Sequence, residues 1–165
     1  HALWTAGGQH PFKNPLEAGL ITVFESSKPV TSSNNIPELF SDNPDHYYQS
    51  QTAEPAYITI ALPPFLRVKL TSYKVGVPTQ QGQRKGGLAS WLVFGSEDDK
   101  DYVLLDNRSD NQDLREPGVI CTFDVTQPSE KYFRYIRLQN NGPTHIGQHR
   151  IIASAFDITG RLIIC

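Results

Sequence analysis

Apolar and polar residues alternate along several short stretches of this chain. Ile58, Ile60 and Leu62 alternate with less apolar neighbours, and Val68 and Leu70 alternate with polar ones. A period of two residues is typical of half-buried antiparallel β-strands. No stretch keeps a helical period over several turns. The pattern therefore predicts a protein built almost entirely from strands.

The predicted strands are short and follow one another quickly. They cover residues 20–24, 47–50, 56–62, 67–77, 88–95, 101–105, 119–125, 132–138 and 150–158. One helical turn is expected at residues 36–40, inside a long polar connection. Adjacent apolar residues at 91–94 and 135–136 indicate either a bulge or burial on both faces of the strand. About eight or nine short strands separated by turn residues predict a β-sandwich or barrel.

Length and composition predict one globular domain. The chain has 165 residues, of which 38% are hydrophobic and 19% charged. We expect an N-terminal arm at residues 1–19, rich in Gly, Pro and Asn, and a domain at residues 20–165. The chain begins at His1 and holds no methionine, which suggests a fragment of something longer. A net charge of -2 gives no reason to expect nucleic acid, and no apolar run is long enough to span a bilayer.

The two cysteines indicate a reducing compartment. Cys121 and Cys165 are too few and too far apart to form a disulfide framework. Cys121 lies in an alternating run on the same face as Phe123, so we expect it to be a small buried hydrophobe. The protein is therefore predicted to be intracellular, either cytoplasmic or associated with the cytoskeleton.

Four segments of the chain carry a resemblance to one family. Residues 90–99 read SWLVFGSEDD, residues 133–138 read FRYIRL, residues 154–160 read SAFDITG, and residues 73–75 read YKV. The first is similar to the "SW.leGS.dg" segment of the discoidin-like domains, also called coagulation-factor type C or galactose-binding-like domains. The second and third are similar to the ending of that family, and residues 73–75 match the strand that precedes its "SW" segment. The resemblance is greatest to the intracellular branch found with BTB-type adaptor proteins.

The resemblance implies an all-β, antiparallel jelly-roll β-sandwich of about eight strands. Its loops would gather at one end of the sandwich and contact partners. The chain departs from the family pattern at Tyr102, where a tryptophan is usual, and at Asp157, where a glutamate is usual. It also has no cysteine near its N-terminus for the disulfide common in extracellular members.

Three loops hold the candidate binding residues. Polar and aromatic side chains in these loops offer hydrogen bonds and stacking surfaces, and Arg84 and Lys85 add positive charge to one loop. The candidate residues are Asp45, His46 and Tyr47, then Gln83, Arg84 and Lys85, then Asn140, Asn141, His145 and His149.

Metal binding and catalysis find little support in the sequence. His145 and His149 are four residues apart in a turn-rich loop, without a third ligand nearby, so we expect solvent-exposed histidines and no metal. Oxygen donors at residues 42–45 are conceivable calcium ligands, but an Asx turn is favoured. The acidic run at residues 97–101 is expected to be a solvated hairpin tip. No Gly-x-Ser-x-Gly elbow or phosphate-binding loop occurs, so we predict a non-enzymatic protein without a cofactor.

Two functions remain open on this sequence. The first is a protein–protein interaction or scaffold component of a larger intracellular assembly. The alternative is a carbohydrate-binding module that uses the loops at one end of the sandwich to hold a glycan. Polar loop tips make membrane insertion unexpected in either case.

Overall fold

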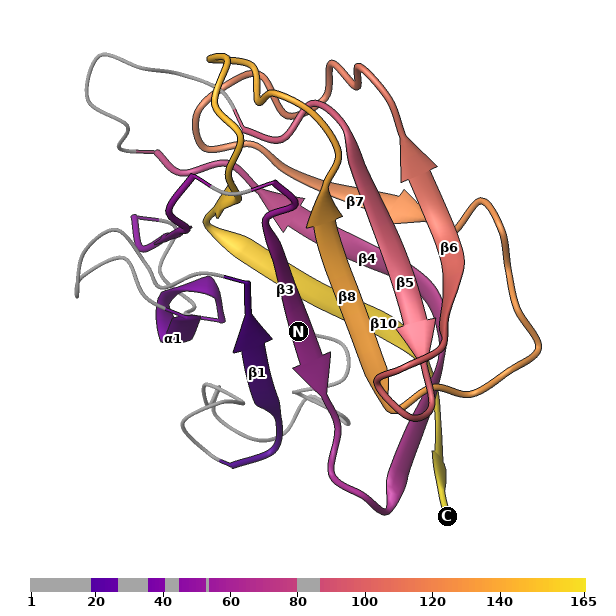
Figure 1. Ribbon diagram of the computed structural model, residues 1–165. Helices are drawn as coiled ribbons and strands as arrows, with labels where there is room; N and C mark the ends of the chain where they lie inside the picture. The colour runs from indigo at the N-terminus through magenta and orange to yellow at the C-terminus, as the bar shows by residue number, and fades with distance from the viewer. Residues whose placement is uncertain (1–18, 27–35, 41–44, 53, 80–86) are drawn as a thin grey trace.

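A computed structural model describes residues 19–26, 36–40, 45–52, 54–79 and 87–165 (Figure 1). The strands are β1 Thr22–Glu25, β2 Tyr48–Gln49, β3 Tyr57–Ala61, β4 Leu66–Gly76, β5 Trp91–Ser96, β6 Tyr102–Arg108, β7 Ile120–Asp124, β8 Tyr135–Asn140, β9 Ile152–Ala153 and β10 Ala155–Ile164. A single helical turn, α1 Ile36–Leu39, lies where one was predicted. Within these residues no helix has the length and apolar character needed to cross a membrane.

The strands form an antiparallel sandwich, as the sequence predicts. One sheet has five strands in the order β1-β3-β8-β5-β6, and the other has three in the order β10-β4-β7. β2 and β9 form a separate two-stranded ladder. Figure 1 shows the five-stranded sheet in front of β4, β7 and β10. This arrangement confirms the predicted all-β jelly-roll sandwich.

Aromatic rings fill the space between the two sheets. Trp91 and Tyr73 are fully buried and both contact Phe123, with ring centroids 5.1 Å and 5.6 Å away respectively. Phe156 meets Tyr73 edge to face at 6.2 Å. Because these rings come from different strands of the two sheets, their contacts fix how the two layers sit on one another.

A buried carboxylate ties the two sheets together next to these rings. The Asp106 side chain is fully buried, and it accepts hydrogen bonds from the Tyr73 hydroxyl, from Thr126 Oγ1 at 2.6 Å and from Arg108 Nε at 3.0 Å. Trp91 Nε1 donates to the Tyr73 hydroxyl at 2.7 Å. Burial alone would raise the pKa of Asp106, but the hydrogen bonds from Thr126, Tyr73 and Arg108 outweigh it and lower that pKa.

The phase of the alternation changes within β4. Val68 and Leu70 face the core in its first half, whereas Tyr73 and Val75 face it in the second half. The ladder with β10 skips one residue of β4 between Leu70 and Ser72, which is a β-bulge. Gly160 lies opposite this bulge, and a Cβ there would overlap the carbonyl oxygen of Lys69. Glycine is therefore required for the close approach of the two strands.

Several details differ from the predicted elements. The strand expected at residues 150–158 is divided at Ser154 into β9 and β10, and β10 continues to Ile164. The ladder of β5 with β6 skips Leu105, so the bulge there belongs to β6. The adjacent apolar residues of β5 are explained by its two faces: Trp91 and Val93 are buried, and Leu92 and Phe94 on the other face are half-buried. Cys121 is half-buried rather than buried, because its strand β7 is at the edge of the three-stranded sheet.

Candidate functional site

A polar pocket of ≈ 290 Å³ opens at one end of the sandwich. It lies where β8 ends and β3 begins, at the upper end of both strands in Figure 1. Its lining residues are Glu54, Pro55, Asn140, Asn141, Gly142 and His149. We call it the Asn140 pocket. The loops before β3 and after β8 meet here because these two strands pair. The backbone amide of Asn140 donates to the Ala56 carbonyl at 2.8 Å.

Asn140 forms the buried wall of this pocket. Its side chain amide Nδ2 donates to the Arg150 carbonyl at 3.1 Å, which anchors the loop that leads to β9. Its Oδ1 is buried, and so is Arg150 Nε, and neither atom has a hydrogen-bond partner within the described part of the chain. An unsatisfied buried polar atom costs about 1–3 kcal/mol. A small rearrangement that brought a donor to Asn140 Oδ1 would therefore stabilise the site.

Glu54 and His149 form the rim. His149 Nδ1 lies 3.0 Å from Glu54 Oε1, and both side chains are substantially exposed. Asn141 is also exposed, while its backbone amide donates to the Ser90 carbonyl at 2.9 Å. The rim thus presents a carboxylate, an imidazole and an amide on a backbone that the neighbouring loops hold in place.

The histidine pair of the sequence is separated in the structure. His145 is half-buried, its Nε2 lies 2.8 Å from the Asn111 carbonyl, and it does not line the Asn140 pocket. The expectation that both histidines are solvent-exposed is therefore wrong for His145, which anchors its loop to a neighbouring one. Within the described ranges no three His, Cys, Asp or Glu side chains are grouped as a metal site would need.

Of the other two predicted binding segments, one does not reach this pocket and one lies outside the described residues. Asp45 Oδ1 accepts a hydrogen bond from Thr79 Oγ1 at 2.6 Å, close to the end of β4. His46 is exposed and Tyr47 is half-buried, and neither lines the Asn140 pocket. Gln83, Arg84 and Lys85 lie outside the described residues, as do the donors Asp42 and Asn43 and the arm residues 1–18.

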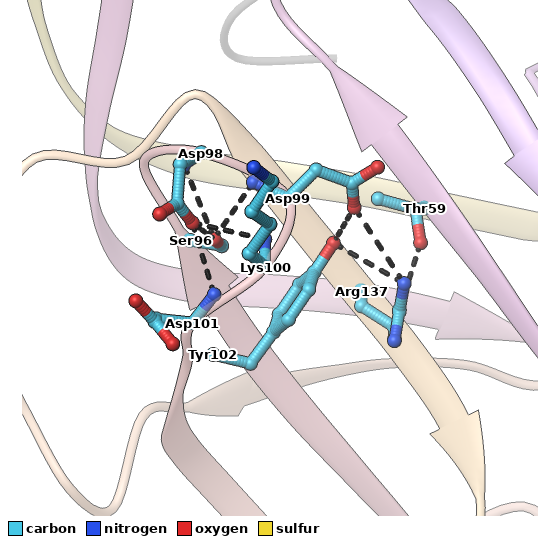
Figure 2. Close-up of polar contacts among 8 residues, drawn as sticks. All are labelled: Thr59, Ser96, Asp98, Asp99, Lys100, Asp101, Tyr102 and Arg137. Atoms are coloured by element: carbon cyan, nitrogen blue, oxygen red, sulfur yellow. Dashed lines mark hydrogen bonds and ion pairs between the residues drawn. The ribbon is translucent and has the colours of Figure 1, made fainter.

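The acidic run after β5 has a structural role in addition to its exposure (Figure 2). Asp98 Oδ1 accepts from the backbone amides of Lys100 and Asp101, both at 2.9 Å, which closes the β5–β6 turn. These amides, that of Asp101 first, lower the pKa of Asp98. Asp99 accepts from the Tyr102 hydroxyl and lies 3.7 Å from Arg137 Nη2. The run is thus a hairpin turn that its own carboxylates stabilise, in addition to the solvated tip that the sequence predicts.

The sequence missed half of the Asn140 pocket. Glu54, Pro55 and Gly142 line it, and nothing in their local pattern indicates a binding role. Glu54 is far from Asn140 in the sequence and joins it only because β3 pairs with β8. The signal for this residue is therefore the strand pairing, which a single sequence does not display.

Comparison with known proteins gives a fold and one related sequence. No family model matches the chain. It is 32% identical over 109 residues to the E3 ubiquitin-protein ligase hecd-1 of Caenorhabditis elegans, a match that covers 66% of this chain and 4% of that protein. The chain therefore spans a small fraction of the length of this relative.

Solved carbohydrate-binding modules share the architecture. CpGH89CBM32-5 of Clostridium perfringens, in complex with GalNAc-β-1,3-galactose, superposes with a TM-score of 0.65 at 11% identity, over 86% of this chain and 96% of that one. The family 32 module of C. perfringens NanJ, in complex with galactose, has a TM-score of 0.63 at 11% identity, over 85% of this chain and 93% of that one. CBM62 of Clostridium thermocellum Xyl5A has a TM-score of 0.64 at 18% identity, over 86% of this chain and 94% of that one. The chain thus has the galactose-binding-like, discoidin-like jelly-roll fold; at these identities the likeness concerns the fold alone.

Proposed function

We propose that this chain is a non-catalytic binding module that holds a neutral saccharide in the Asn140 pocket. The observation that carries the proposal is the lining of that pocket: a carboxylate, two amides and an imidazole around a cavity of ≈ 290 Å³. Sugar hydroxyls both donate and accept hydrogen bonds, so a lining of mixed donors and acceptors suits them. The volume is close to the lower limit of small-ligand pockets, about 300 Å³, which favours a terminal sugar over a long chain.

The charge at the rim favours a neutral ligand over an acidic one. The Glu54 carboxylate borders the cavity, and the His149 imidazole beside it carries a compensating charge only when it is protonated. A uronic or sialic acid would bring a second carboxylate close to Glu54, and like charges at short range repel. Neutral hexoses avoid this cost.

The structural neighbours support the same function. Two of them were solved with galactose or a galactose-containing disaccharide. This chain presents its polar pocket among the loops at one end of the same sandwich. No Phe, Tyr or Trp is among the described residues that line the pocket, so the proposed ligand is held mainly by hydrogen bonds rather than by stacking.

A titration with simple sugars tests the proposal. Galactose and N-acetylgalactosamine added at millimolar concentrations to the isotope-labelled chain should shift the amide resonances of Asn141, Gly142 and His149, and glucuronic acid should not. Asn141→Ala removes one hydrogen-bonding side chain from an exposed position, so it should weaken binding about fivefold to tenfold without unfolding the protein.

Asn107→Ala is the matched control, because Asn107 is an exposed asparagine on β6 that does not line the pocket. Its sugar affinity should equal that of the unmodified chain. Resonance shifts that occur only elsewhere, or no response to either neutral sugar, would refute the proposed site.

A second candidate is a protein-interaction module in a larger intracellular assembly, of the kind attached to BTB-type adaptors. The observation that favours it is the 32% identity with hecd-1, which exceeds the identity with each of the three carbohydrate-binding modules. A complex with a purified protein that persists in excess galactose and in Asn141→Ala would support this function. Loss of that complex both in excess galactose and in Asn141→Ala would show that the partner binds through the Asn140 pocket.

A further inference from the structure

Strand β10 leaves large apolar side chains exposed near its end. β10 is an edge of the three-stranded sheet, and among the described residues no strand pairs with its other side. Leu162 is 40% exposed and Ile164 is 82% exposed. Natural sheet edges are usually protected by charge, proline or a covering loop, because a free edge pairs readily with another strand. At this edge the apolar residues are uncovered.

One of these exposed side chains, Leu162, borders an apolar pocket. Leu162 pairs with Val68 and Ile164 with Leu66, so both lie on the side of the sheet that faces the core. The five-stranded sheet does not cover this end, and a cavity of ≈ 310 Å³ remains there. It is lined by Gly19, Leu20, Leu62, Pro63, Phe65, Leu66 and Leu162. In Figure 1 this is the lower end of the sandwich, opposite the Asn140 pocket.

The other side of the same strand end is basic. Arg161 pairs directly with Lys69, and the next pair on that side contains Arg67. Lys69 is neutralised by Glu130 at 2.6 Å, but the Arg67 guanidinium donates to the uncharged carbonyls of Pro64 and Leu66. Arg161 is exposed, and Lys69 opposite it already has Glu130 as its partner, so Arg161 is the charge on β10 that lacks a carboxylate among the described residues. A carboxylate on a strand added at the free edge would supply one.

We propose that the free edge of β10 binds an extended segment of a partner protein in which apolar and acidic residues alternate. Added as a strand, such a segment points every second side chain to the same face. Its apolar residues then lie against Leu162 at the pocket and beside Ile164, and an acidic residue lies beside Arg161. Arg67 is one strand further away, on β4, and adds positive charge to the same face. The interaction goes beyond saccharide binding and does not depend on it.

A second copy of this chain fits the edge less well. Two β10 strands that pair antiparallel around a two-fold axis keep their basic sides on the same face of the joined sheet. With the axis near Arg161, the Arg161 side chains of the two copies would then lie close to one another, without a carboxylate between them. Charge complementarity therefore selects a different, acidic segment.

Two synthetic peptides and a charge reversal test the proposal. The probes are fluorescent nine-residue peptides, one alternating valine with glutamate and the other valine with lysine, followed by anisotropy with the full chain. The glutamate peptide should bind at least tenfold more tightly. Arg161→Glu should reverse the preference, and Leu162→Asp should weaken the binding of the glutamate peptide at least tenfold.

Ile120→Glu is the matched control, because Ile120 is an exposed apolar residue on β7, the opposite edge of the same sheet. It should leave both affinities unchanged, and thermal unfolding should show that all three variants are folded. Equal binding of the two peptides, an unchanged preference in Arg161→Glu, or a concentration-dependent dimer abolished by Leu162→Asp would each overturn the proposal. None of these results alters the sugar titration, so the two proposals fail independently.

Discussion

Replacing Asp106 with alanine should lower the free energy of unfolding by about 3–5 kcal/mol, the usual cost of removing one partner from a buried charged cluster. The variant leaves the buried Tyr73 hydroxyl without its acceptor and leaves Arg108 without its carboxylate. Thr126, whose hydroxyl and amide both donate to Asp106, loses its link to β6. Urea denaturation at neutral pH measures the loss.

The coupling between Asp106 and Tyr73 separates this network from simple loss of packing. Tyr73→Phe removes only the hydroxyl, and in the Asp106→Ala background it should cost at least about 1 kcal/mol less than in the unmodified chain, because the acceptor is already gone. Asp124→Ala is the control, since Asp124 is an exposed aspartate on β7, the strand that pairs with β4 next to Tyr73. Additive losses for Asp106 and Tyr73 would show that the hydrogen bond contributes nothing of its own.

Acid gives an independent check of the same carboxylate. The pKa of Asp106 in the folded protein lies below its ordinary value of 3.8, so its contribution to stability is complete above that pH. The contribution is lost as the pH falls through the folded pKa. The difference in stability between the unmodified chain and Asp106→Ala should therefore be constant near neutrality and shrink below pH 3.8. A difference that persists at the lowest pH would contradict an ionised Asp106.

The sequence predicts most strands because the signal for a strand is local. Alternation at Ile58 and Ile60 correctly predicts a strand with both residues in the core, but Thr59 and Ala61 are buried as well, so β3 is not the half-buried strand that the alternation predicts. The details it missed depend on neighbours far along the chain. The bulge in β4 is set by Gly160 on β10, and the break at Ser154 accompanies a hydrogen bond from its amide to the Gly76 carbonyl at 3.0 Å.

The candidate site shows the same division. Asn140, Asn141 and His149 belong to one loop, so a search for polar loops finds them together, and their role in binding stays a prediction. Glu54 reaches the pocket through the pairing of β3 with β8. His145 lies outside the pocket because its ring contacts the loop that contains Asn111. Spacing along a loop does not encode such contacts, so the sequence offered a histidine pair where the structure has two separate residues.

The exposed end of β10 also escaped the sequence analysis, for a different reason. Leu162 and Ile164 continue an apolar alternation and would be assigned to the core of any sandwich. Their exposure depends on where the opposite sheet ends. β10 extends past the cover that the five-stranded sheet provides, which leaves the apolar pocket open.

Gly95→Ala should destabilise the protein by about 2–3 kcal/mol, the cost of forcing extra volume into a packed core. Gly95 is in β5 within the Gly-Ser pair that carries the family resemblance, and the ring of Phe133 lies directly against it. A Cβ at this position would come within 2.5–2.8 Å of three Phe133 ring carbons. Phe133 cannot easily move, because it is 2% exposed and its backbone exchanges two hydrogen bonds with Val68, at 2.7 Å and 2.8 Å.

Removing the ring should remove the penalty. Phe133→Leu alone should cost about 1–2 kcal/mol for the lost contacts, but Gly95→Ala added to it should cost less than about 0.5 kcal/mol, since the new methyl group then occupies freed space. Phe94→Leu is the matched background, because that half-exposed ring is not among the atoms a Gly95 Cβ would meet. In that background the full penalty should persist in thermal and urea unfolding. A penalty that persists equally in both backgrounds would mean that the protein needs this glycine for its backbone conformation and not for its contact with the Phe133 ring.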